Sequence, residues 1–329
     1  MAIIDFHNHF FPPEYLEAVQ RGPSNVKVTF DSKNNPLLHY PGDYNVIVPE
    51  HRDIGVRAEV LEKSSVDKQV LTFTTPGVHI ESADFAVDLA RMVNDSFAII
   101  MRERSDQFAA LATLPLNDPA ASVTELERAI QGLGFKGAAL HSNINGVALS
   151  DKRYWPLYEK ANELEAVFDI HPSFPVGVEA MKEYWLMPLI GFPFDTTLAA
   201  AKLVFSGVVE KFPKIRWVLG HLGGAIPYLA ERLDRGFHAF RACRENISQP
   251  PSVYLKTFYY DTVNFDPMAL QFAVDFAGAD HLLAGSDFPH QIGSLEKMVS
   301  SIEELEISAE EKKKISGSNA ARLLDLLSS

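Results

Sequence analysis

The stretch Ile-Ile-Asp-Phe-His-Asn-His, residues 3–9, decides the fold class of this chain. Its apolar, β-rich start predicts a buried strand over Ile3–Phe6, and two histidines stand at the end of that strand. Alternate side chains of a strand point to the same face, so His7 and His9 are directed at one point. Imidazole is the commonest ligand for zinc and related metals. The stretch therefore predicts a pair of metal ligands, with two satisfied surface histidines as the alternative.

Seven further apolar runs of strand length follow, and helical periodicity separates most of them. This alternation is typical of a parallel sheet buried on both faces, and eight such units predict an α/β fold of the closed (β/α)8 or TIM barrel type. An open doubly wound sheet normally has a glycine-rich loop after its first strand, where this chain has His-Asn-His. The later strands are predicted at Lys68–Phe73, Ala109–Leu114, Phe135–Leu140, Ala166–Ile170, Arg216–Leu219, Phe258–Tyr260 and His281–Ala284, and the helices at Ala83–Arg104, Pro119–Gly132, Tyr154–Glu165 and Ala225–Arg241.

Two segments depart from this alternation. Val26–Phe30 and Leu37–Tyr40 flank a polar turn, which predicts a small β-hairpin inserted after the first strand, at about residues 22–50. Phe174–Thr197 is rich in proline, aromatic residues and methionine, and we expect a lid-like excursion there after the fifth strand. Because no linker or internal repeat is visible, residues 1–329 are expected to form a single domain.

The composition excludes several classes of protein. Of the 329 residues, 47% are hydrophobic and 22% are charged, as in a folded domain with a large core. The formal net charge of -13 argues against nucleic acid or a membrane surface as a partner, because both attract basic proteins. The single cysteine, Cys243, excludes a disulfide framework. We find no signal-peptide pattern and no long apolar run, so a cytoplasmic protein is expected.

Three more polar residues stand at the ends of other predicted strands. His171 follows the fifth strand, His221 follows the sixth, and Asp287 follows the eighth. The carboxyl ends of barrel strands form one ring, where barrel enzymes place their active sites. These side chains and the two histidines of the first strand are therefore expected to converge. The residues alone do not divide the roles of His171 and His221.

This set of motifs resembles the amidohydrolase superfamily, and within it the branch of aminocarboxymuconate-semialdehyde decarboxylase and the metal-dependent aromatic-acid decarboxylases. The resemblance implies a non-oxidative, metal-dependent carboxy-lyase that acts on an aromatic or enol-type carboxylic acid, either aminocarboxymuconate semialdehyde-like or hydroxybenzoate-like. A metal-dependent hydrolase of a lactone or amide on the same site is the alternative, and a non-catalytic binding protein is disfavoured because every site position is filled. The stretches that carry the resemblance are residues 5–12, 135–138, 171–172, 184–191, 212–214, 220–225, 285–289 and 318–324.

The resemblance also implies the roles of the converging residues. His221 is implied as the catalytic general acid or base, and Asp287 is a second catalytic candidate. Zn2+ is the first expectation for the metal and Mn2+ the second, since nitrogen and oxygen ligands suit both. The implied ligands of this one divalent metal are His7, His9, His171 and Asp287.

The substrate-binding residues match the family less well. The family binds a dicarboxylate with arginines, and Arg232 stands where one of them reaches into a neighbouring subunit, which implies a homodimer or higher homo-oligomer. Where another arginine is expected the chain reads Tyr-Asn-Val-Ile-Val-Pro (44–49), and Arg52 and Arg57 are interpreted as a solvated helix face. His141, at the end of the fourth strand, is a candidate for substrate binding, with a structural role as the equal alternative.

The remaining histidines carry no firm assignment. His290, three residues after Asp287, is interpreted as a surface loop residue, with pocket lining as the alternative. A small-molecule carboxylate is the expected partner besides further copies of the chain. The histidines without a predicted function are His39, His51, His79, His238 and His281.

Overall fold

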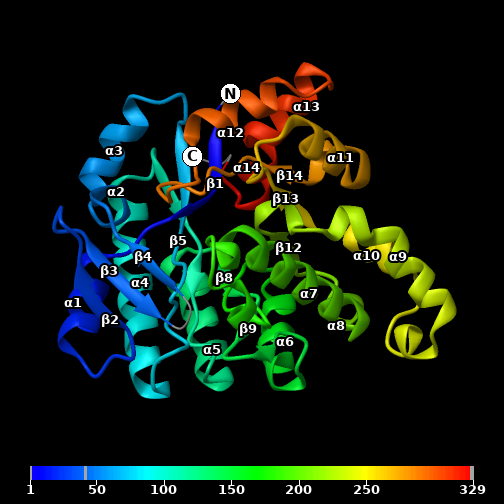
Figure 1. Ribbon diagram of the computed structural model, residues 1–329, viewed down its shortest axis with the longest axis horizontal. Coiled ribbons are helices and arrows are strands. Elements are labelled where there is room, and N and C mark those ends of the chain that lie inside the picture. The colour runs from blue at the N-terminus through cyan, green and yellow to red at the C-terminus, as the bar shows by residue number, and fades with distance from the viewer. Residues whose placement is uncertain (1, 41–42, 327–329) are drawn as a thin grey trace.

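The predicted barrel is present, with eight strand positions around one core and helices on the outside (Figure 1). The structure is a computed structural model that describes residues 2–40 and 43–326. The pairings between neighbouring barrel strands are parallel, and the third strand position is split in two at Leu111. In order around the barrel the strands are β1 (Ile4–His9), β5 (Lys68–Thr72), β6 (Phe108–Ala110) with β7 (Ala112–Thr113), β8 (Gly137–His141), β11 (Val167–His171), β12 (Arg216–Leu219), β13 (Tyr259–Asp261) and β14 (Leu282–Leu283).

The barrel closes between its first and last strands. The backbone N–H of Phe6 donates to the carbonyl of Ala284 at 2.7 Å, and Asn8 forms a parallel bridge with Phe288. β1 therefore has a partner on each side, and the sheet has no open edge at this point. The prediction of a closed barrel is confirmed, and each predicted strand overlaps an observed one.

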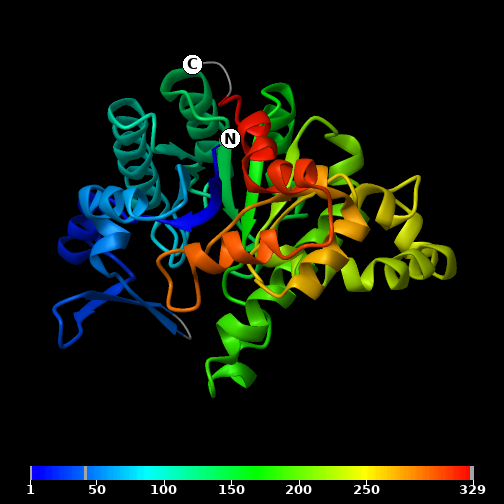
Figure 2. The same ribbon diagram turned by 90° about the horizontal axis from the view of Figure 1, so that it is seen from above.

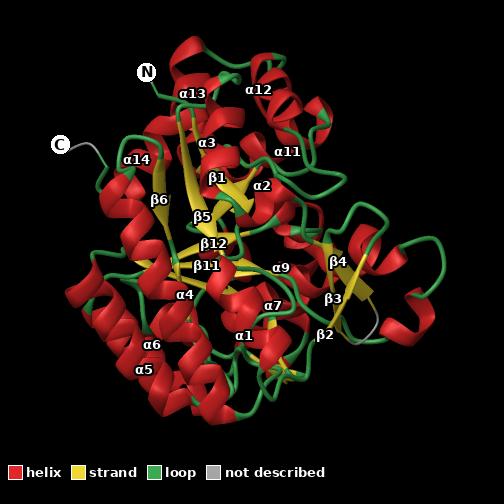
Figure 3. Ribbon diagram, turned by 90° about the vertical axis from the view of Figure 1, so that its left-hand side faces the viewer, coloured by secondary structure: helices red, strands yellow, loops and turns green. Residues whose placement is uncertain are grey.

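Helices surround the strands, as Figure 3 shows by colour. Asp118 and Asp266 begin two of them, because each carboxylate accepts a backbone N–H of the first turn and a proline follows. No helix among the described residues is long and apolar enough to cross a membrane. The longer helices are α1 (Pro13–Arg21), α3 (Ile54–Glu62), α4 (Ala83–Glu103), α5 (Pro119–Glu127), α6 (Trp155–Glu163), α7 (Phe192–Phe205), α9 (Ile226–Ala239), α11 (Pro267–Ala277) and α12 (Leu295–Glu303). The shorter elements are α2 (Pro49–Arg52), β9 (Asn143–Ile144), β10 (Val147–Ala148), α8 (Val208–Lys211), α10 (Pro251–Leu255), α13 (Ala309–Lys313) and α14 (Asn319–Leu323).

Two apolar layers determine which strand residues point into the barrel. On β11, Val167 belongs to a cluster inside the barrel, whereas Phe168 and Ile170 belong to the layer between strands and helices. Because alternate residues share a face, His171 points inward like Val167 and lies at the carboxyl end of the barrel. At the opposite end, α14 packs its apolar side chains against the start of β1. α14 closes the amino end of the barrel, and the carboxyl end stays open to the candidate site.

The insertion after β1 differs in one respect from the prediction. The predicted hairpin is present as β2 (Lys27–Phe30) and β3 (Pro36–Tyr40), but a third antiparallel strand, β4 (Asp43–Val46), pairs with β3. The predicted hairpin is confirmed, but the third strand was not predicted, because aspartate and asparagine are depleted in strands and the sequence Asp-Tyr-Asn-Val gives only a weak signal. Residues 41 and 42, inside the predicted insertion, lie outside the described residues.

The excursion after β11 is helical and shorter than predicted. It contains a 3-10 turn at Val178–Met181 and a π-helical turn at Met187–Gly191, and residues 192–197 form the first turns of α7 instead. In Figure 2 this segment and the three-stranded sheet protrude on the same side of the barrel. Their aromatic rings meet, since the centroids of Tyr44 and Trp185 are 5.6 Å apart. The two excursions thus form one cover at the open end.

Candidate metal centre

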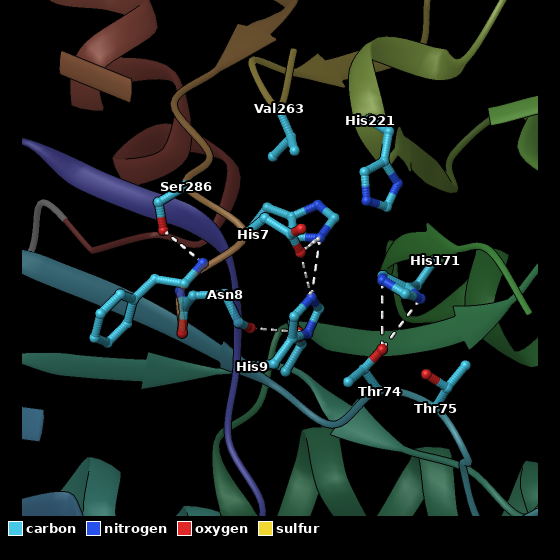
Figure 4. A network of polar contacts seen from close by, with 12 residues as sticks. His7, Asn8, His9, Thr74, Thr75, His171, His221, Val263 and Ser286 are labelled. Carbon is cyan, nitrogen blue, oxygen red and sulfur yellow. Dashed lines mark hydrogen bonds and ion pairs between the residues drawn. The ribbon is translucent and has the colours of Figure 1, made fainter. Parts of the chain in front are cut away.

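Four buried side chains from three strand ends converge at the open end of the barrel (Figure 4). His7 and His9 lie on β1, His171 ends β11, and Asp287 follows β14. One ligand atom of each lies within 4.8 Å of the others. Nε2 of His9 is 3.1 Å from Nε2 of His7 and 3.1 Å from Oδ1 of Asp287. The structure therefore brings together the four residues that the family resemblance implied as ligands.

The chemistry of these donors fits a divalent cation. Nδ1 of His7 bonds to Asp261, which leaves Nε2 of His7 as an acceptor directed at Nε2 of His9. Two imidazole lone pairs and a carboxylate oxygen that face each other repel unless a proton or a cation lies between them. Three nitrogens and one oxygen are a usual ligand set for zinc and related metals.

The ionisation of the cluster is consistent with ligation. Burial lowers the pKa values of His9 and His171 well below the ordinary value of a histidine, so both rings are neutral. Burial also acts to lower the pKa of His7. The nearby carboxylates oppose this effect, Asp261 more strongly than Asp287, and the pKa of His7 lies well above the ordinary value. Burial acts to raise the pKa of Asp287, yet its hydrogen bonds with His7 and His9 hold it well below the usual range. A cation that binds here takes the place of the proton on His7.

Asp261 is a functional residue that the sequence reasoning missed. It ends β13, and its carboxylate accepts hydrogen bonds from Nδ1 of His7 and from the backbone N–H groups of His221, Leu222 and Val263. A carboxylate behind a metal-binding histidine fixes the tautomer and increases the basicity of the ring. The available signal was its place at the end of the seventh strand, which was the argument used for Asp287 and the histidines. The predicted strand stopped one residue short of it, at Tyr260.

His221 lies on a strained turn above the cluster. Its φ is 54° and that of Leu222 is 57°, a left-handed conformation that side chains with a Cβ rarely adopt. Gly224 completes the turn, where an added Cβ would lie 1.9 Å from the carbonyl oxygen of Pro193. The centroid of the His221 ring is 4.9 Å from that of His7. Nδ1 of His221 is buried and has no hydrogen-bond partner among the described residues, and burial lowers its pKa.

Arg57 supports the centre from behind, and its interpretation as part of a solvated helix face is wrong. The side chain is fully buried, and its guanidinium donates to the carbonyl of His9 at 2.6 Å, to Oδ1 of Asn8 at 2.7 Å and to Oε1 of Gln69 at 2.7 Å. Burial lowers its pKa to about 9. The helical pattern of α3 hid this role, because a polar residue on the buried face of a helix resembles an exposed one in sequence. Arg52 is half-buried and donates to the carbonyl of Ile47.

A cavity of 340 Å³ opens onto the centre. His171, His221 and Asp287 form its floor, and both excursions contribute to its walls, including Tyr44 and Trp185. Its size and mostly apolar lining suit a small aromatic molecule. A larger cavity of 530 Å³ lies beside Asp195 and Lys202, but none of the four ligands lines it.

The other predicted site residues lie outside this cavity. His141 is buried at the end of β8 with its ring 6.4 Å from that of His171, and it is not among the lining residues. Arg232 is exposed on α9 and does not line the cavity of its own chain. His51, which had no predicted function, does line it. His290 lines it too, so its surface interpretation is wrong and the alternative of pocket lining is confirmed. No predicted strand ends near His51, so the strand-end rule could not have identified it.

A barrel with three histidines and one aspartate around a divalent-metal site, and a fourth histidine facing a cavity, defines a metal-dependent barrel enzyme. The family model described as amidohydrolase matches residues 4–326, and the chain belongs to that family.

Several known proteins similar to this chain are named as decarboxylases. A relative from Dictyostelium discoideum, named 2-amino-3-carboxymuconate-6-semialdehyde decarboxylase, is 34% identical over 98% of this chain and 91% of its own. The 6-methylsalicylic acid decarboxylase of Penicillium expansum is 27% identical over 99% of this chain and 97% of its own. A solved structure of dihydroxybenzoic acid decarboxylase from Polaromonas sp. JS666, with bound manganese and the inhibitor 2-nitroresorcinol, has a TM-score of 0.83 at 25% identity and covers 100% of this chain and 98% of that one.

Proposed function

We propose that this protein is a metal-dependent, non-oxidative decarboxylase of an aromatic or enol-type carboxylic acid. The observation that carries the proposal is the buried set of three histidines and Asp287, of which His171 and Asp287 line the floor of a cavity beside the unpartnered Nδ1 of His221. Relatives that share nearly the full length of this chain carry the names of such enzymes. The substrate is accordingly a small-molecule carboxylate.

Decarboxylation replaces a carboxylate on carbon with a proton and releases carbon dioxide. A divalent cation held by His7, His9, His171 and Asp287 would supply Lewis-acid polarisation of the substrate carboxylate. His221 holds a proton at Nδ1 and transfers it to the carbon that bears the carboxylate, and Asp287 is the second group near enough to take part in proton transfer. As the carbon–carbon bond breaks, its electron pair returns to the ring or diene. Arg57 and Asp261 keep the ends of β1 and β13 in place for this chemistry.

The proposal also includes the identity of the metal and the oligomeric state. Zinc is the first candidate and manganese the second, because the ligand set suits both. The exposed position of Arg232 on α9 suits a side chain that reaches a neighbouring copy, so we include a homodimer or higher homo-oligomer in which Arg232 contacts the substrate of the adjacent subunit.

Release of carbon dioxide tests the proposal. Metal-depleted protein is reloaded with zinc or with manganese and incubated with hydroxybenzoates and muconate-type acids, and a chelated sample is the control. Metal-dependent carbon dioxide from at least one acid is the expected result. Hydrolysis of lactones or amides by protein of confirmed metal content, with no carbon dioxide from any acid, would overturn the proposal in favour of a hydrolase.

A further inference from the structure

His51 is a buried histidine whose hydrogen-bonding capacity is unused. It lies on α2, its side chain is 1% exposed, and neither ring nitrogen has a hydrogen-bond partner among the described residues. Buried polar atoms without partners are rare and costly in folded proteins. The ring of His51 lines the cavity above the metal centre, so a molecule in that cavity is within reach as the missing partner.

His290 extends this wall toward the metal centre. Its ring centroid is 5.0 Å from that of His51 and 4.8 Å from that of His9. Both rings line the same cavity, and each imidazole can donate a hydrogen bond from one nitrogen and accept one at the other. Together they form a polar strip that leads from His9 into a pocket whose lining is mostly apolar.

The charge of the cavity limits what this strip can bind. No lysine or arginine is among the described residues that line it, and the nearby Arg57 is committed to the backbone and side chains behind β1. The metal balances one carboxylate of a substrate. A second carboxylate against His51 would be buried without a cation in the same chain, which is costly. An uncharged hydroxyl group needs only one acceptor and one donor.

We propose that His51 and His290 form a subsite for an uncharged hydroxyl substituent of the substrate ring, so that the protein prefers hydroxylated aromatic monocarboxylic acids. This inference rests on the proposed function for the placement of the carboxylate at the metal. It assigns specificity to two residues that do not bind the metal. The three positional isomers of hydroxybenzoate are the probes, and unsubstituted benzoate is their reference.

Equilibrium binding tests the subsite independently of turnover. Isothermal titration calorimetry of metal-loaded protein measures the affinity for each hydroxybenzoate relative to benzoate. One hydrogen bond corresponds to about a fivefold to tenfold preference, and we expect at least one isomer to show it. His51→Phe and His290→Phe are expected to abolish the preference while benzoate affinity stays within about twofold, since only the hydrogen bonds are removed. His238→Phe, on the exposed face of α9, is the matched control.

Two further measurements keep the test decisive. His51→Gln retains a hydrogen-bond donor and an acceptor, and it is expected to show part of the preference for hydroxybenzoate over benzoate. This variant also replaces His51→Phe in the test if His51→Phe fails to fold. Isophthalate, with a second carboxylate in place of the hydroxyl, is expected to bind more weakly than 3-hydroxybenzoate. Equal loss of benzoate and hydroxybenzoate affinity in His51→Phe, or tight binding of isophthalate, would overturn the inference. In that case metal-dependent release of carbon dioxide would still support the proposed function, because that assay reports on the metal centre and not on His51 and His290.

Discussion

The carboxylate of Asp261 bonds to Nδ1 of His7 and, through the same oxygen, accepts the backbone N–H of His221 at 3.0 Å. One side chain thus positions His7, a proposed metal ligand, and the turn that carries His221, the proposed acid–base residue. Any change in Asp261 is expected to affect both. The relationship links two steps of the proposed reaction, binding of the carboxylate and delivery of the proton.

Asp261→Asn tests this link. The amide has one acceptor oxygen where the carboxylate has two, so either His7 and the N–H of His221 lose their acceptor, or the N–H groups of Leu222 and Val263 lose theirs. We expect metal affinity to fall by about 10-fold to 100-fold and turnover to fall further than metal loss explains. Competition with a chelator measures the affinity, and Asp266→Asn at the start of α11 is the control. Unchanged affinity and turnover would show that Asp261 has only a packing role.

Metal content separates the roles of the histidines. His7→Ala and His171→Ala are expected to lose bound metal and activity together, because each removes one of four ligands. His221→Ala is expected to keep its metal and to lose about 10²-fold to 10⁴-fold in kcat, as removal of a positioned acid–base group does. Elemental analysis beside the kinetic assay measures both. Loss of metal from His221→Ala would mean that His221 is a ligand and that the assigned roles are exchanged.

Much of this architecture could be predicted because it depends on local pattern. The strands are apolar runs with a polar residue at the end, and the same rule located the candidate site residues from His7 to Asp287, although it could not divide the roles of His171 and His221. The supporting residues could not be found in this way. Arg57 and Asp261 act through partners that lie 49 and 254 residues away in the chain. Such contacts exist only after the barrel closes.

The cover of the cavity was also beyond local pattern. β4 has a weak strand sequence and is held by its pairing with β3, and the helical segment after β11 contacts it through Tyr44 and Trp185. His51 gave no signal because α2 is a short helix at the end of an insertion. Whether a histidine is buried there depends on how the insertion folds back over the barrel, which a sequence pattern does not encode.

Arg57→Met tests the support behind β1. The variant keeps most of the side-chain volume but leaves the acceptors of Gln69 and Asn8 without their donor. We expect the free energy of unfolding to fall by about 3–5 kcal/mol, as when one partner of a buried charged network is removed. Urea denaturation measures the change, and Arg52→Met, which removes a half-buried residue, is expected to cost less than about 1 kcal/mol. Similar values for the two variants would contradict the supporting role of Arg57.

The pH dependence of stability is expected to report on Asp195. Burial raises the pKa of this carboxyl, although hydrogen bonds from Ser142 and Asn143 oppose the shift. A carboxyl whose folded pKa is raised holds its proton more tightly in the folded state, so its contribution is present below pH 3.8 and is lost as the pH rises through the folded pKa. Relative to Asp195→Asn, the wild type should therefore lose unfolding free energy as the pH rises above 3.8 and through the raised folded pKa. Parallel stability curves for the two proteins would rule out this contribution.

Arg232 tests whether the active unit contains more than one chain. The side chain is exposed on α9 and is absent from the lining of its own cavity, so it can contact substrate only in a neighbouring copy. Arg232→Ala is expected to raise KM by about tenfold, because a charged contact to a carboxylate is lost, while metal content stays the same. The nearby Arg235→Ala, also exposed on α9, is the control. Size-exclusion chromatography with light scattering should give a dimer or larger assembly for the wild type. A fully active monomer, or equal effects of the two substitutions, would show that Arg232 is an ordinary surface residue.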